Sequence, residues 1–297
     1  MFPRVAVIGA GSIGCVLAAW LHEADRSVQL CARGSLGRIE VTHAGEISEY
    51  DVPVVYRPED TAPADIVFVT TKAQHTAAIG DWLSALTSDA TTVVAAQNGV
   101  RHAERFAGLV APAQVVPAAV YIGAERIGPG RVEHRTGNVL LVPRQPGVDV
   151  LHEACAGSRL TVRAGEDFLT ASWQKLLGNL GANPVTALTL GRSDVLADPS
   201  VRALVVDLLT EAVAVGRAEG ARLDDSAVDE VLRFYDELPA GSGTSMLYDR
   251  LADRSTEHEY LTGAVVRAGE RHGIATPANS AVLALMRGLE LRLARVD

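Results

Sequence analysis

The sequence lacks the features that mark several large classes of protein. Its three cysteines, Cys15, Cys31 and Cys155, are isolated, so we predict neither a disulfide framework nor a metal site. No apolar run approaches the ~18 residues that a membrane-spanning helix requires. The apolar run near the N-terminus has one early arginine and does not resemble a signal peptide. These absences favour a cytoplasmic protein with reduced, buried cysteines and no membrane partner.

An excess of basic residues is also absent. The 27 Lys and Arg residues stand against 36 Asp and Glu, which gives a formal net charge of −9. Nucleic-acid binding needs a basic surface, so we expect no nucleic-acid partner. An anionic small molecule remains compatible, because the charge of a site can oppose that of the whole chain. With 297 residues, of which 48% are hydrophobic, the chain is long enough for two domains.

The most informative motif opens the chain. A short β-prone run at residues 4–8 is followed by Gly9-x-Gly11-x-x-Gly14 and then by an Ala- and Leu-rich helical stretch. In dinucleotide-binding proteins the first glycine permits a tight turn, the second lets the backbone approach a pyrophosphate, and the third allows close packing of the helix. The predicted cofactor-binding residues of this turn are Gly9, Ala10, Gly11, Ser12, Ile13 and Gly14. The alternative is an ordinary glycine-rich strand–helix turn.

The residue that follows the second predicted strand bears on the choice of cofactor. Enzymes that use NAD usually have Asp or Glu there to bind the ribose 2′-hydroxyl. This chain has Arg33, with Arg38 soon after. A guanidinium pairs well with phosphate oxygens, so we predict NADP(H) as the cofactor, with Arg33 at the 2′-phosphate. The alternative is that Arg33 is a solvated charge at the end of a strand.

The order of the predicted elements gives the fold class. Strands and helices alternate in the first half, and the pattern is helical from residue 167 onward. We predict an α/β protein with an N-terminal Rossmann-like doubly wound sheet (1–166) followed by an all-α C-terminal domain (167–297). The β-like runs at 131–134 and 138–142 are expected to extend the sheet in antiparallel fashion. The expected strands of the main sheet are residues 4–8, 27–32, 65–70, 91–96 and 114–121.

Three groups of polar residues are candidates for chemistry. Lys72 and the turn Gln97-Asn98-Gly99 each follow a predicted strand, where α/β sheets bind ligands, although a surface lysine and a simple Asn-Gly turn are the alternatives. Lys175, Asn179 and Asn183 recur every four residues, which predicts one polar face of a single helix. Such a face is costly to bury without partners, so we expect it to line a binding site rather than a solvated surface.

The third group is an acidic segment. Glu257 is expected in the first turn of a helix, where the dipole favours a carboxylate. Glu259 can form a capping box with Thr256. The sequence therefore allows a purely structural explanation of these acids.

Together these motifs resemble the ketopantoate reductase (2-dehydropantoate 2-reductase) family over nearly the whole chain. The paired Lys and Glu motifs are more specific than the glycine motif. The matching residues are Gly9-x-Gly11-x-x-Gly14, Lys72, Gln97-Asn98-Gly99, Trp173-x-Lys175, Asn179, Asn183-Pro184, Ser245-Met246, Thr256-Glu257 and Gly273-Ile274-Ala275-Thr276-Pro277-x-Asn279.

The resemblance implies NADPH-dependent reduction of a small 2-keto acid, ketopantoate, to a 2-hydroxy acid in pantothenate biosynthesis. Lys175 is then the general acid, and Glu257 binds the nascent hydroxyl and holds Lys175. The remaining implied residues bind substrate (Asn98, Asn179, Asn183 and Ser245) or cofactor (Lys72 and Asn98).

The chain departs from the family pattern after Glu257. His258 and Glu259 stand where the family usually has Ile-Asp, and Thr262 replaces an Asn. A paralogous reductase of another 2-keto acid therefore remains an alternative, as do a β-hydroxyacid dehydrogenase and an NADP(H)-binding sensor without turnover. The apolar helices of the second half leave open whether the protein forms a homodimer.

Overall fold

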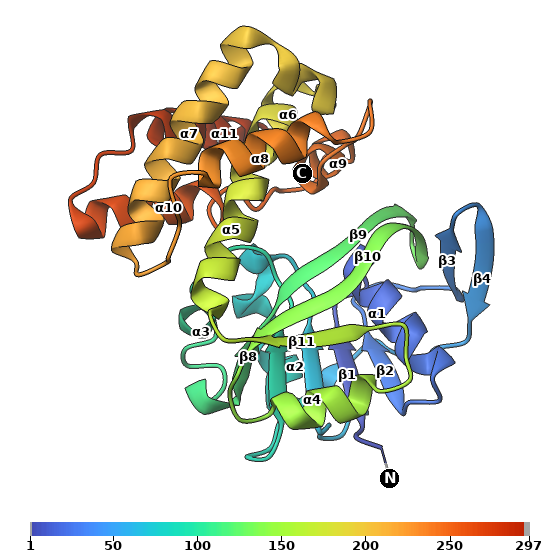
Figure 1. Ribbon diagram of the computed structural model, residues 1–297. Helices are drawn as coiled ribbons and strands as arrows, with labels where there is room; N and C mark the ends of the chain where they lie inside the picture. The colour runs from blue at the N-terminus through green and yellow to red at the C-terminus, as the bar shows by residue number, and fades with distance from the viewer. Residues whose placement is uncertain (1, 294–297) are drawn as a thin grey trace. The chain divides into compact units, whose positions relative to one another are not determined.

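The computed structural model describes residues 2–293 and divides into two compact units (Figure 1). Unit 1 holds the residues up to Phe168 except 98–100, and unit 2 holds residues 98–100 together with those from Leu169 onward. The assignment of cofactor binding to residues 1–166 and of substrate chemistry to 167–297 stays a proposal.

A parallel sheet forms the centre of unit 1. Its strands are β1 (Val5–Ile8), β2 (Val28–Cys31), β5 (Val54–Val55), β6 (Ile66–Val69), β7 (Thr92–Ala95) and β8 (Val115–Pro117). Their order is β5-β2-β1-β6-β7-β8. Val5 of β1 pairs with Val28 on one side and with Ile66 on the other. Because the strands are covered on both faces, most of their residues are apolar. The expected Rossmann-like sheet is thus confirmed.

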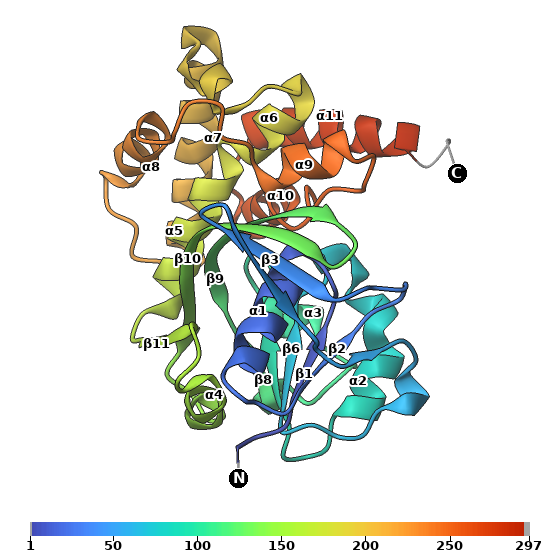
Figure 2. The same ribbon diagram turned by 90° about the vertical axis from the view of Figure 1, so that its right-hand side faces the viewer.

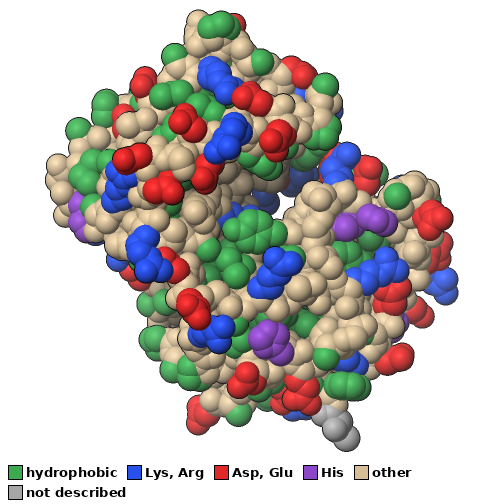
Figure 3. All heavy atoms as spheres, in the orientation of Figure 1, with side chains coloured by type: hydrophobic (Ala, Val, Ile, Leu, Met, Phe, Trp, Pro, Cys, Tyr) green, Lys and Arg blue, Asp and Glu red, His purple; other side chains and the backbone are tan. Residues whose placement is uncertain are grey.

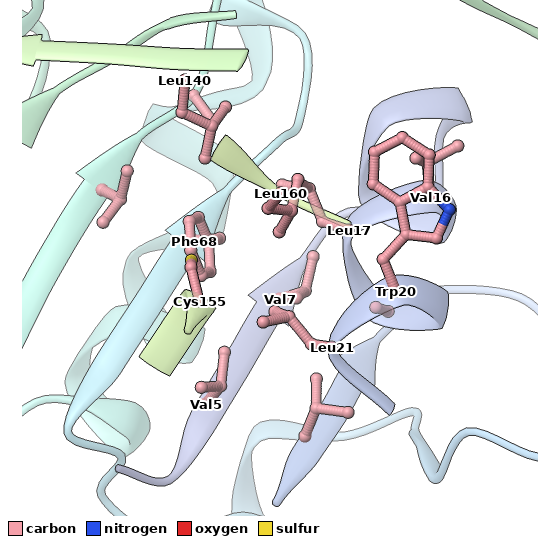
Figure 4. Close-up of a cluster of buried hydrophobic side chains, with 14 of the residues drawn as sticks. Val5, Val7, Val16, Leu17, Trp20, Leu21, Phe68, Leu140, Cys155 and Leu160 are labelled. Atoms are coloured by element: carbon pink, nitrogen blue, oxygen red, sulfur yellow. The ribbon is translucent and has the colours of Figure 1, made fainter. Parts of the chain in front are cut away.

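Alternate residues of β1 supply two separate cores. Val5 and Val7 face the core shared with α1 (Ser12–Glu23) and α4 (Val148–Cys155). Figure 4 shows this core, in which Val7 lies against Leu17 and Leu21 of α1. The neighbouring residues Ala6 and Ile8 face the core that includes residues of α2 (Gly80–Leu86) and Phe106, which follows α3 (His102–Arg105). All three cysteines are buried and free.

A second sheet covers the other side of α1. Its strands are β3 (Ile39–His43), β4 (Glu46–Tyr50), β9 (Ala119–Gly128), β10 (Arg131–Pro143) and β11 (Thr161–Gly165), in the order β11-β10-β3-β4 with β9 paired to β10. Helix α1 contacts strands of both sheets (Figure 2). On α1, Trp20 packs edge-on against His134 of β10, with ring centroids 4.8 Å apart.

Two expectations about these strands are wrong. Residues 131–134 and 138–142 form the single strand β10 of the separate sheet, instead of an antiparallel extension of the parallel one. The expected strand at 114–121 is divided between β8 and β9. Ala118 N still donates to the Ala95 carbonyl of β7 at 3.1 Å, and from Ala119 onward the chain pairs with β10 instead, which divides the expected strand.

Unit 2 is helical, as predicted. Its helices are α5 (Phe168–Leu180, which begins at the last residue of unit 1), α6 (Asn183–Thr189), α7 (Pro199–Ala218), α8 (Ala227–Asp236), α9 (Ser245–Leu251), α10 (Thr262–His272) and α11 (Pro277–Leu293). Short 3-10 helices occur in both units at Pro58–Asp60, Ala73–His75, Ala77–Ile79, Pro112–Gln114 and Ser193–Ala197.

Asp198-Pro199 is a sequence pattern typical of a helix start, with Asp as N-cap and Pro in the first position, and α7, the longest helix of unit 2 among the described residues, begins there. The Asp198 side chain accepts hydrogen bonds from the backbone N–H groups of Ser200 (2.9 Å) and Val201 (3.1 Å) at the start of α7. Farther along α7, a Cβ on Gly216 would lie 3.0 Å from the ring of Trp173 on α5, so glycine permits their close packing.

Acidic and basic side chains are interspersed over the face seen in Figure 3. Among residues 2–293, no helix has the length and apolarity to cross a membrane.

Candidate active site

The glycine-rich turn of unit 1 has the geometry of a phosphate-binding loop. Gly9 has a φ of +114°, which glycine adopts without strain, and the turn leads into α1 with Gly11 as its N-cap. A Cβ on Gly14 would lie 1.8 Å from the Gly9 carbonyl oxygen, so only glycine fits. A Cβ on Gly11 would meet no atom within 4 Å. The N-terminus of α1 therefore offers backbone N–H groups and open space to an anion.

The basic residues predicted to bind the cofactor differ in their surroundings. Arg33 is exposed just after β2, and none of the described residues gives it a hydrogen bond or ion pair. Its neighbour Arg38 is instead paired with Glu49 at 3.2 Å. Lys72 is half-buried after β6 and precedes the short helix at 73–75. Arg33 and Lys72 both follow the carboxyl ends of parallel strands that flank β1, as the binding edge of such a sheet requires.

Gln97, which the sequence singles out only as part of a turn, organises the ends of β6 and β7. Its buried side chain donates to the Thr71 carbonyl (2.9 Å) and accepts from Arg105 (2.9 Å). The Gln97 carbonyl accepts a hydrogen bond from Nε2 of the buried His102 (2.9 Å). Burial lowers the pKa of His102 to about 4, so its ring is neutral at pH 7 and acts here as a donor. These bonds fix the backbone that leads into Asn98.

Three of the predicted site residues come together in unit 2. The Asn98 side-chain amide donates to Glu257 Oε2 at 3.0 Å, across 159 positions of sequence. Glu257 is only 4% exposed. Burial lowers the pKa of Lys175 from 10.5 to about 8, and the Glu257 carboxylate opposes that fall. An ammonium group with a pKa near neutrality can give up and regain its proton at physiological pH, as a general acid must.

The two asparagines near Lys175 leave donors without partners. Nδ2 of Asn179 and Nδ2 of Asn183 are buried, and neither has a hydrogen-bond partner among the described residues. Buried amide N–H groups nearly always have a hydrogen-bond partner, so these two donors are candidates to bind an acceptor atom of a ligand. A bound carboxylate or hydroxyl has the chemistry to satisfy them.

The expectation that Lys175, Asn179 and Asn183 lie on one helix is wrong. Lys175 and Asn179 lie on α5, which ends at Leu180, whereas Asn183 begins α6. Pro184 stands in the first turn of α6 and has no N–H to donate to the carbonyl four residues earlier, so a continuous helix is disfavoured. The chain nevertheless keeps both asparagine side chains buried or half-buried.

Ser245 has a different setting from the other predicted substrate residues. It is exposed at the start of α9. The preceding residue, Thr244, caps α9 by accepting from Leu247 N at 3.1 Å, and its hydroxyl lies 2.7 Å from that of Thr186 on α6. Ser245 is thereby tied to α6, but within residues 2–293 its hydroxyl forms no hydrogen bond with Lys175 or Glu257.

The position of Glu257 corrects a further expectation. Glu257 does not lie in the first turn of a helix, because α10 begins only at Thr262. Glu259 forms no capping box with Thr256. Its carboxylate instead accepts from Arg267 (2.8 Å) and Arg287 (2.5 Å), and these ion pairs lower its pKa. The purely structural explanation for Glu257 as a dipole partner is therefore wrong.

A Rossmann-like sheet with a glycine-rich turn, followed by helices that carry a lysine beside a buried carboxylate, defines a class of two-part oxidoreductases. Family models agree. The model described as ketopantoate reductase PanE/ApbA matches residues 5–146, and the model for the C-terminal part of the same family matches residues 167–290. The chain belongs to the ketopantoate reductase family.

Individual relatives support this membership. The chain is 40% identical over 289 residues to a 2-dehydropantoate 2-reductase of Caulobacter vibrioides, which covers 97% of this chain and 99% of that one. It is 37% identical to a 2-dehydropantoate 2-reductase of Mycobacterium tuberculosis, in an alignment that covers 96% of this chain and 97% of that one. Its structure is similar to that of a dimeric ketopantoate reductase from Staphylococcus aureus, with a TM-score of 0.89, 25% identity, and coverage of 98% and 99%.

Proposed function

We propose that this protein reduces ketopantoate to pantoate with NADPH, with Lys175 as the general acid. The observation that carries the proposal is the buried Glu257, bonded to Asn98 at 3.0 Å and acting on a lysine whose pKa lies near 8. The curated relatives named above are 2-dehydropantoate 2-reductases over nearly their full length.

Unit 1 would hold the cofactor. The N–H groups of the turn at residues 9–14 would bind its pyrophosphate, Arg33 its 2′-phosphate, and Lys72 its other polar groups. Asn98, which belongs to unit 2, is the further cofactor-binding residue that the family resemblance implies. When bound, NADPH supplies the hydride. The open space beside Gly11 supports this assignment, since a backbone can approach a phosphate closely only where no side chain intervenes.

Unit 2 would supply the proton and the substrate contacts. Lys175 Nζ gives its proton to the carbonyl oxygen of the 2-keto acid and stabilises the negative charge that develops there. Glu257 accepts a hydrogen bond from the new hydroxyl and favours the charged form of Lys175. Asn179 and Asn183 donate their unpartnered amide N–H groups to the substrate, and Ser245 orients its polar end.

The departures His258 and Glu259 bear on the alternative that the substrate is another 2-keto acid. Glu259 is bonded to two arginines of its own unit, and His258 Nδ1 lies 2.9 Å from the Thr256 hydroxyl. These side chains therefore have scaffold partners that account for their presence without a change of substrate. The two departures therefore give no support to the paralogous alternative, and the relatives named above support ketopantoate.

The test is NADPH oxidation, followed at 340 nm with ketopantoate, beside NADH as donor. We expect turnover with NADPH that Lys175→Ala abolishes and that Gln174→Ala, a change at the exposed neighbour on α5, leaves intact. Tight NADPH binding without turnover of ketopantoate would contradict the proposed substrate and lead to other 2-keto acids. Equal activity in Lys175→Ala would contradict the role of the lysine.

We also propose that the protein forms a homodimer. The solved relative from Staphylococcus aureus is described as dimeric. Light scattering coupled to gel filtration tests this directly, and a mass near the 31.3 kDa of one chain would contradict it.

A further inference from the structure

The segment that carries Glu257 is irregular, yet its carboxylate is held at a defined place. Helix α9 ends at Leu251 and α10 begins at Thr262, and the residues between them form turns and irregular chain. Glu257 is nevertheless 4% exposed and bonded to Asn98. A loop residue keeps such a position only when the surrounding structure fixes its backbone.

One side chain from another helix fixes the residue next to Glu257. Glu290 of α11 accepts two hydrogen bonds at the same oxygen, from the Thr256 backbone N–H at 2.8 Å and from the Thr256 hydroxyl at 3.0 Å. Hydrogen bonds to an ionised carboxylate are roughly twice as strong as neutral ones. Glu290 thus ties the loop to a long helix at the position immediately before Glu257.

His258 also contacts Thr256, and we call Glu290, Thr256 and His258 together the clamp. Its Nδ1 lies 2.9 Å from the Thr256 hydroxyl. Because the single proton of that hydroxyl is donated to Glu290, the ring donates from Nδ1, while its Nε2 lies 3.7 Å from Oε1 of Glu259. Burial lowers the pKa of His258, against the influence of Glu290 and Glu259. Behind the ring, Glu259 is held by Arg267 and Arg287.

We propose that Glu290 is a positioning residue for the reduction: by holding Thr256, it keeps the Glu257 carboxylate beside Asn98 and Lys175. The inference deepens the proposed function and rests on it. The hydrogen bonds of Glu290 reach Thr256 of the loop, so its effect on the reaction passes through the loop. It adds to the site a residue that lies 33 positions after Glu257 on a different helix.

The clamp has a consequence that a merely structural role does not have. Glu257 favours the charged form of Lys175. If the loop is released and the carboxylate moves away, burial acts on the ammonium without that opposition, and the pKa of Lys175 falls below its value near 8. A general loss of stability elsewhere in unit 2 leaves this balance unchanged.

The sequence makes this consequence measurable, because Lys72 and Lys175 are its only lysines. In protein labelled with 13C at the lysine side chains, NMR titration follows the two ε-carbon signals separately, and Lys72→Arg assigns them. The measurement needs neither substrate nor cofactor. Lys72 then serves as an internal reference within the same sample.

The matched variants are Glu290→Gln and Glu211→Gln. Glu211 of α7 also fixes backbone with its carboxylate, accepting from Ala278 N (2.8 Å) and Asn279 N (2.9 Å), but these lie at the start of α11 and not in the loop that carries Glu257. We expect Glu290→Gln to lower the pKa of Lys175 by about half a unit or more and to lower kcat about tenfold with little change in the KM for NADPH. Glu211→Gln should leave that pKa unchanged.

Two further variants keep the inference testable if Glu290→Gln does not fold. Thr256→Val removes the hydroxyl bond to Glu290 and should also lower the pKa of Lys175. Thr256→Ser keeps the hydroxyl and should leave this pKa at its wild-type value. An unchanged pKa of Lys175 in both Glu290→Gln and Thr256→Val would overturn the clamp. If the wild type does not reduce ketopantoate but these shifts occur, the proposed function fails and the clamp stands.

Discussion

Adding one methyl group at either of two glycines in the first turn should separate folding from cofactor binding. In Gly14→Ala the new Cβ would lie 1.8 Å from the Gly9 carbonyl oxygen and 2.6 Å from Thr70 Oγ1. The oxygen belongs to the backbone at the end of β1 and cannot rotate away as a side chain could. In Gly11→Ala the new Cβ would meet nothing within 4 Å. The two changes are chemically identical and lie three residues apart.

The expected free energies of unfolding differ for these reasons. Alanine gains about 1 kcal/mol over glycine inside a helix, but overpacking costs typically 1–3 kcal/mol. With a backbone atom as the obstacle we expect the upper end of that range, so Gly14→Ala should lose about 2 kcal/mol. At the N-cap, alanine loses about 0.5–1 kcal/mol against glycine, and the stiffer unfolded chain returns about 0.4–1 kcal/mol. Gly11→Ala should therefore be nearly neutral for stability.

Urea unfolding measures the first quantity, and NADPH titration the second. Gly11→Ala should keep the wild-type midpoint while its Kd for NADPH rises about tenfold or more, because the methyl group takes space that a pyrophosphate needs. Gly14→Ala should unfold at lower urea. An unchanged Kd for NADPH in Gly11→Ala would refute the placement of the phosphates, and a wild-type midpoint in Gly14→Ala would refute the packing argument.

Three further predictions concern charge. Above pH 8, kcat/KM for reduction should fall tenfold per pH unit as Lys175 loses its proton, with the break at lower pH in Glu257→Gln; a flat profile would contradict the general acid. Arg33→Glu should raise the Kd for NADPH about tenfold or more and spare NADH, whereas equal losses for both would contradict the 2′-phosphate contact. His102 stays neutral when folded down to pH about 4 but binds a proton below pH 6.5 when unfolded. The free energy of unfolding should therefore decrease by up to about 1.4 kcal/mol for each pH unit as the pH falls from 6.5 to about 4. His102→Gln should reduce this pH dependence, measured by urea unfolding at a series of pH values; an equal pH dependence in the two proteins would contradict the prediction.

The glycine-rich turn and the start of α7 could be predicted because each is a local signal. The positive φ of Gly9, the crowded position of Gly14 and the cap by Asp198 all follow from a few neighbouring residues. Such features depend on backbone sterics and on capping bonds that short spacings reveal. The Rossmann-like sheet followed by helices was predicted from the same kind of pattern, summed over longer stretches.

The second sheet and the loop of Glu257 could not be predicted in this way, because distant segments define them. Strand β10 pairs with β3, which lies far earlier in the chain, and nothing in the short run at residues 39–43 identifies its partner. Spacing did not pair Lys175 with Glu257; the family resemblance did. The bond between Asn98 and Glu257 spans 159 positions. The carboxylate of Glu290 that fixes this loop carries no motif at all.

The use of arginine and lysine in this chain separates two tasks. The sequence has 27 basic residues of these two types but only two lysines, and both occupy predicted site positions. Arginine stays charged in proteins and forms the ion pairs that hold Glu259 and other carboxylates. Of these two cations, only the ammonium has a pKa that burial can lower to about 8 while a neighbouring carboxylate acts to raise it, as at Lys175. Scaffold pairing by arginine and proton transfer by lysine are thus assigned to chemically different cations, which is the arrangement expected if position 175 must lose a proton in each cycle.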